Sequence, residues 1–130
     1  MLFRSNRARD WLLQAEKDLE TAEIARNAGR HEWACFATQQ AAEKAVKALH
    51  LHLGQEAWGH LVARLLKELP LQVPQELVEK ARYLDGLYIP TRHPDAFPEG
   101  PLAEHYGPLQ SEDAIGYARE ILGFVRAQMA

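Results

Sequence analysis

The sequence predicts an all-α protein, an up-and-down bundle of about five helices with one long proline-rich loop at 87–110. Apolar residues recur at spacings of three and four along most of the chain, as on one face of a helix. No segment shows the strict alternation of a strand, and glycines and prolines separate the periodic segments. A length of 130 residues, 47% of them hydrophobic and 25% charged, is typical of one globular domain spanning 1–130.

The first two helices are expected at about 6–28 and 31–53, with Gly29 and Gly54 as their stops. In the first, one apolar face contains Ala8, Leu12, Ala15, Leu19 and Ala22, widened by Trp11 and Ile24. The second carries a ridge of alanines, Ala34, Ala37, Ala41, Ala45 and Ala48, with Ala42, Val46, Leu49 and Leu53 beside it. Small side chains allow close approach of another helix, so this segment is expected to be the central helix.

Three further helices follow these two. A short one is expected at about 59–69, and the next begins at Pro74, because proline is tolerated in a first helical turn. The last helix is expected to open with Ser111 as its N-cap, followed by Glu112 and Asp113 in the first turn.

Charge and cysteine content exclude several classes of protein. The net charge is −3, so nucleic-acid binding would need a local patch of cations. Cys35 is the single cysteine, which excludes an internal disulfide and indicates a buried, inert thiol in a reducing compartment. The N-terminus lacks the features of a signal peptide, and no window has the apolar length of a membrane span, so we expect a soluble, cytoplasmic protein.

The segment LYIPTRHPDAFPEG at 87–100 contains three prolines around an Arg–His pair. The residue before a proline is restricted, so Arg92 and His93 are expected in a stiff turn that loses little entropy on binding a ligand. A guanidinium fits phosphate and an imidazole moves protons near neutral pH, which together suit phosphodiester chemistry. Alternatively, Arg92 pairs with Asp95 or caps a helix end, and the prolines only route the loop.

Other polar residues suggest fewer roles. None of the histidines has the spacing of a helical zinc pair, so no metal or other cofactor is expected; they are His31, His50, His52, His60, His93 and His105. His60 is expected to form a local cap or to contact a neighbouring helix. The polar half of the second helix predicts either a solvated face or the lining of a cleft or subunit interface; it comprises Gln39, Gln40, Glu43, Lys44 and Lys47.

The order of these segments resembles the HEPN family, a higher-eukaryote and prokaryote nucleotide-binding domain. The resemblance rests on QQAAEKAVKAL at 39–49, on His60-Leu61 at the start of a short helix, and on LYIPTRHPD at 87–95. It extends to the W-L-x-x-A-x-x-D-L pattern at 11–19 and so covers nearly the whole chain.

The resemblance implies a helical bundle that forms homodimers and belongs to a toxin–antitoxin or defence pair with a minimal nucleotidyltransferase. In such pairs the HEPN chain is commonly a metal-independent ribonuclease with an Arg, four to six residues and a His. Arg92 matches that arginine, but the next histidine after His93 is His105, thirteen residues beyond Arg92. Either His93 or His105 substitutes, or the proton-transfer group is missing. Tyr106 is the residue implied as a site of nucleotidylation by the partner.

Two functions are therefore open. In the first, the protein is a binding module that holds a nucleotide or RNA phosphate at Arg92, with Asp95, Lys44 and His60 as further ligand-binding candidates. In the second, it is an endoribonuclease in which a 2′-hydroxyl attacks the adjacent phosphate, His93 or His105 moves the proton and Arg92 stabilises the transition state. A bundle with a purely structural role is the third alternative.

Overall fold

The computed structural model describes residues 2–88 and 99–130, with side chains from Arg7 onward. This part of the chain contains no strand, which confirms the predicted all-α fold. Its elements in chain order are α1 (Leu2–Asn27), α2 (His31–His52), α3 (Val62–Lys67), α4 (Gln75–Asp85), the 3-10 helix η2 (Leu102–His105) and α5 (Pro108–Met129).

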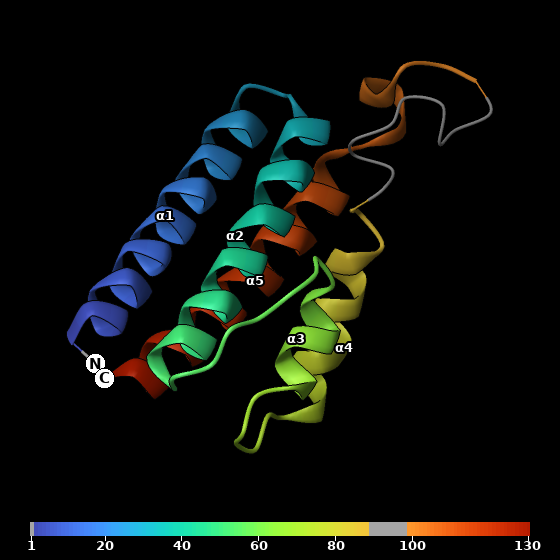
Figure 1. The fold of residues 1–130 in the computed structure, drawn as a ribbon. Helices are drawn as coiled ribbons and strands as arrows, with labels where there is room; N and C mark the ends of the chain where they lie inside the picture. The colour runs from blue at the N-terminus through green and yellow to red at the C-terminus, as the bar shows by residue number, and fades with distance from the viewer. Residues whose placement is uncertain (1, 89–98) are drawn as a thin grey trace.

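Three long helices, α1, α2 and α5, lie side by side, and the shorter pair α3 and α4 packs against them (Figure 1). Helix α2 contacts every other element, which confirms its predicted central position. The end of α5 lies beside the first turns of α1, where Arg9, Met129 and Ala130 line one surface hollow.

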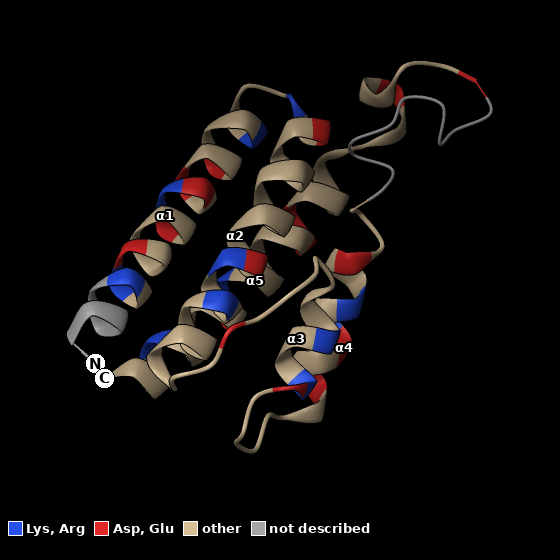
Figure 2. Ribbon diagram, in the orientation of Figure 1, with Lys and Arg blue, Asp and Glu red and all other residues tan. Residues whose placement is uncertain are grey.

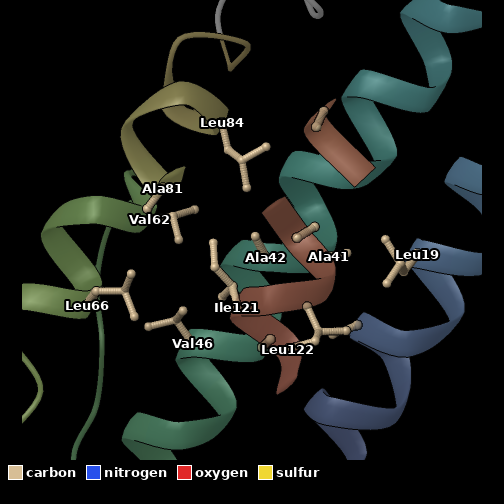
Figure 3. Packing of buried hydrophobic residues seen from close by; sticks show 14 of the residues in the cluster. Leu19, Ala41, Ala42, Val46, Val62, Leu66, Ala81, Leu84, Ile121 and Leu122 are labelled. Atoms are coloured by element: carbon tan, nitrogen blue, oxygen red, sulfur yellow. The ribbon is translucent and has the colours of Figure 1, made fainter. Parts of the chain in front are cut away.

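The core forms where all five α-helices of the described chain meet (Figure 3). Every alanine of the predicted ridge on α2 is buried, and the larger side chains around it come from the other helices. The residues that point toward one another there include Leu19, Ala41, Ala42, Val46, Val62, Leu66, Ala81, Leu84, Ile121 and Leu122. Small residues on α2 let its neighbours approach closely, and their leucines and isoleucines fill the remaining volume.

Two predicted helix boundaries hold because glycine relieves a backbone constraint. Gly29 follows α1 and Gly54 follows α2 with φ of 77° and 79°, the left-handed region that favours glycine at a helix end. Helix α3 is shorter than the predicted 59–69, since its N-cap, Leu61, is extended.

The prediction that Ser111 caps the last helix was wrong. Helix α5 begins at Pro108 after the extended Gly107, because proline at the first helical position needs no N–H partner. Ser111 therefore lies within the first turn and is buried. Its hydroxyl lies 3.2 Å from the Pro108 carbonyl and 2.8 Å from the Nδ1 of His31.

Some predicted core residues face solvent instead. Ile24, expected to widen the apolar face of α1, has 68% of its surface exposed, and Leu53, expected beside the alanine ridge of α2, is exposed as well. The buried thiol expected at Cys35 is confirmed. Within the described residues, no helix combines the length and apolar content that crossing a bilayer requires.

Candidate functional site

Helix α2 is charged over only a short stretch. Apart from Glu32 in its first turn, the charged residues of the helix are Glu43, Lys44 and Lys47 (Figure 2). Gln39, Glu43 and Lys47 are spaced four apart, so their side chains line up along one stripe of the helix. Gln39 is fully buried and Glu43 nearly so, which shows that the solvated-face interpretation was wrong for these two residues.

A loop brings His60 against this stripe. Gly59 has a φ of 97°, a conformation that favours glycine and lets the chain turn just before His60. The His60 Nδ1 lies 3.1 Å from Glu43 Oε2, and the Lys47 Nζ donates to the same oxygen at 3.0 Å. The predicted contact between His60 and a neighbouring helix is therefore confirmed, whereas no side chain caps α3 from position 60.

Gln39 holds the loop and the helix together. Its Nε2 donates to the His60 carbonyl at 3.0 Å and lies 3.4 Å from Glu43 Oε1, while its Oε1 accepts from Gln40 Nε2 at 2.9 Å. Tyr88, after the end of α4, stacks on the imidazole with ring centroids 5.0 Å apart and an interplanar angle of 17°. We call Gln39, Glu43, Lys47, His60 and Tyr88 the His60 cluster.

Asp85 fixes the helix beside this cluster. Its carboxylate accepts from the N–H groups of Val62 at 2.6 Å and Ala63 at 3.0 Å, so α4 supplies the N-terminal cap of α3. Burial raises the pKa of Asp85 above its ordinary value, the two N–H groups oppose that rise, and the charge of Glu43 adds to it. Sequence patterns did not reveal this cap because the partners are more than twenty residues apart.

Two surface hollows meet at the loop that precedes α3. One, of about 430 Å³, is lined by residues that include Trp11, Lys47 and Glu56, and the other, of about 350 Å³, includes Arg64, Asp85 and Tyr88. Trp58, Gly59 and His60 line both. Trp58 is 78% exposed, so a flat aromatic surface lies next to the His60 cluster. Such surfaces stack readily with nucleobases.

The structure separates the predicted site residues. Arg92, His93 and Asp95 lie outside the described residues. Lys44 pairs with Asp18 at 2.6 Å and lines a third hollow against α1 with Arg7 and Trp11, so it does not join the His60 cluster.

The other two predicted residues lie around η2. The Nε2 of His105 is 2.6 Å from the Glu99 carbonyl, and because a carbonyl only accepts, this nitrogen carries the hydrogen. Tyr106 is 6% exposed, and burial together with the charge of Cys35 raises its pKa to about 12. Modification of Tyr106 stays a prediction, and it requires this buried side chain to become accessible.

Among the described residues, no group of three or more His, Cys, Asp or Glu side chains gathers to hold a metal ion. The His60 cluster supplies an imidazole, a carboxylate and an ammonium group. These side chains can donate hydrogen bonds to an anion and can move a proton.

Comparisons with known proteins agree with this fold. The family model of the HEPN domain matches residues 8–128. The crystal structure of TT1696 from Thermus thermophilus has 54% sequence identity and a TM-score of 0.92, covering 95% of this chain and 98% of that one.

Two more solved structures are similar. ST0689, described as an archaeal HEPN homologue, has 40% identity and a TM-score of 0.82 over 95% of this chain and 98% of its own. A HEPN domain protein from Thermotoga maritima, tm0613, has 36% identity and a TM-score of 0.74 over 91% of this chain and 95% of its own. A search of curated proteins found no match.

Proposed function

This chain belongs to the HEPN domain family, and we propose that it is the HEPN component of a toxin–antitoxin or defence pair with a minimal nucleotidyltransferase. In this proposal the protein binds a nucleotide or an RNA phosphate through Arg92, as a homodimer in the cytoplasm. A gene for a small nucleotidyltransferase beside this one, and copurification of the two products, would support the pairing.

The observation that carries the binding proposal is the location of the His60 cluster in the chain. Tyr88, which stacks on His60, is the last described residue before the segment with Arg92, and Arg92 follows it by four residues in the sequence. The cluster and the exposed Trp58 supply flat rings for a base, and a guanidinium supplies a rigid fork for its phosphate. Together these groups match the two parts of a nucleotide.

A second function, metal-independent endoribonuclease activity, is supported by a different observation. The imidazole of His60 faces a nearly buried carboxylate and has more than half of its side-chain surface exposed. That arrangement suits a group that exchanges protons with a substrate.

The binding proposal is tested by titrating fluorescently labelled single-stranded RNA and a labelled ATP analogue with purified protein. We expect Arg92→Ala to weaken binding of at least one ligand by about tenfold or more, since a charge-assisted contact to phosphate is lost. Arg82→Ala is the matched control, because Arg82 lies exposed on α4 and pairs with Glu79. Equal affinity of the wild type and Arg92→Ala would contradict the proposal.

A further inference from the structure

The orientation of the His60 ring is determined by its neighbours. A carboxylate oxygen only accepts hydrogen bonds, so the Nδ1 that faces Glu43 Oε2 carries the hydrogen. In the neutral ring the lone pair then lies on Nε2, for which the described residues provide no hydrogen-bond partner. The His60 side chain is 57% exposed and that of Glu43 is 8% exposed, so the ring lies between a buried carboxylate and the solvent.

This arrangement differs from that of the other histidines whose contacts the structure describes. His50 lies inside the protein with both ring nitrogens in contact with Gln55 and the Leu65 carbonyl. His105 faces the carbonyl of Glu99, and His31 faces the hydroxyl of Ser111. The carboxylate that faces His60 can stabilise the imidazolium that forms when the ring takes up a proton.

Two further contacts hold the pair in place. The stacked ring of Tyr88 restricts rotation of the imidazole, and Lys47 with Gln39 restricts the carboxylate. A proton-transfer group has to be held in its working geometry by such surrounding contacts.

We propose that His60 is the proton-transfer residue of an RNA-cleaving site and that Glu43 is the positioning residue that holds its working tautomer. This inference rests on the ribonuclease function proposed above and identifies a histidine from the loop before α3 as its base. The substrate is single-stranded RNA, with a base stacked on Trp58 and a phosphate beside Arg64 in the hollow that His60 also lines.

The reaction balances without a metal or an oxidant. His60 Nε2 takes the proton of a 2′-hydroxyl while that oxygen forms a bond to the adjacent phosphorus. The bond from phosphorus to the 5′-oxygen breaks, and the leaving oxygen takes a proton from water. The imidazolium then returns its proton to the hydroxide that remains. The products are a 2′,3′-cyclic phosphate and a 5′-hydroxyl.

The test is cleavage of labelled single-stranded RNA by the full-length protein, with the end groups identified and RNA affinity measured in parallel. We expect His60→Gln to lower the cleavage rate by about a hundredfold or more, as for loss of a general base, while affinity changes less than about threefold. His52→Gln is the matched control, since His52 is an exposed histidine at the end of the same helix as Glu43. It should retain the wild-type rate.

Two variants separate proton transfer from loss of structure. In His60→Ala, added imidazole should restore part of the activity, which it could not do if the side chain only supported the fold. Glu43→Gln keeps an oxygen for the Nδ1–H but removes the charge opposite the imidazolium. We expect kcat to fall about tenfold or more with KM little changed.

The outcomes distinguish this inference from the functions proposed above. Cleavage by His60→Gln within threefold of the wild type, together with loss of cleavage in Arg92→Ala, would overturn the role of His60 and leave the ribonuclease function intact. RNA that stays whole at high excess of wild-type protein, but binds through Arg92, would overturn the inference and leave the binding module.

Discussion

Burial affects the reactivity of two ionisable side chains of α2, Glu43 and Cys35, in opposite ways. Glu43 is buried with Lys47 and His60 as its partners, so its charge is compensated within hydrogen-bonding distance. Only removal of both partners would leave an uncompensated buried charge, which is costly. Cys35 is buried among apolar groups, and burial followed by the charge of Glu32 raises its pKa to about 12. Glu43 is thus suited to chemistry and Cys35 is not.

The pKa of Cys35 leads to a prediction about its reactivity. The thiolate is the reactive form, and a rise from 9.0 to about 12 leaves roughly a thousandfold fewer thiolates at pH 8. We expect the folded protein to resist a thiol-specific colorimetric reagent at this pH and to react with one equivalent after unfolding in guanidinium chloride. Rapid labelling of the native protein would show that the thiol is reachable.

Helix α3 is too short to be stable alone. Its residues span fewer than two turns, and isolated helices of that length are not stable in water. Its stability depends on the buried faces of Val62, Leu65 and Leu66 and on the carboxylate of Asp85, which caps its first N–H groups. The loop that carries His60 leads directly into this helix, so the cap also stabilises the candidate site.

Removal of the cap should therefore lower the stability of the fold. We expect Asp85→Ala to reduce the free energy of unfolding by about 1–2 kcal/mol, measured by urea denaturation, because two N–H groups lose their acceptor. Asp113→Ala, at an exposed position of α5, is the control.

The pH dependence of this effect follows from the raised pKa of Asp85. A carboxyl with a folded pKa above its ordinary value of 3.8 contributes most stability below that value and less as the pH rises through the folded pKa. The free energy of unfolding of the wild type should thus exceed that of Asp85→Ala by more at about pH 3.5 than at about pH 7. A difference that grows with pH would contradict the direction of the shift.

Charges of both signs are mixed over the whole molecule. Figure 2 shows blue and red segments interspersed along α1 and α4, and many of the described lysines and arginines pair with nearby carboxylates. The net charge of −3 and these pairings among the described residues do not favour binding of a long nucleic-acid backbone. The proposed RNA contacts of the protein are therefore few.

Few phosphate contacts should give a weak salt dependence of RNA binding. Each phosphate neutralised on a single strand contributes about −0.7 to the slope of log affinity against log salt concentration. With contacts from Arg92 and Arg64, we expect a slope of about −1 to −2, measured by fluorescence anisotropy at several salt concentrations. A slope steeper than about −4 would indicate a basic surface formed by another assembly of chains.

Local patterns were sufficient to predict the helices and much of the core. The spacing of Ala34, Ala41 and Ala48 identified the central helix, because burial on a helix recurs with the period of its turns. Gly29 and Gly54 marked two ends, since few other residues accept a positive φ. The predicted start of the last helix at Ser111 was wrong, because Pro108, earlier in the same segment, is an equally good first residue for a helix.

The pairing of residues across the fold could not be read from the sequence. Lys44 and His60 were both predicted to bind ligand, yet only His60 joins Glu43, and Lys44 turns to Asp18 on α1. Asp85 caps a helix that begins 23 residues earlier in the chain. Helix formation depends on neighbours within a turn or two, and the order of residues encodes those neighbours directly. Contacts between distant segments depend on how the helices pack and where the loops direct them, so they exist only once the chain has folded.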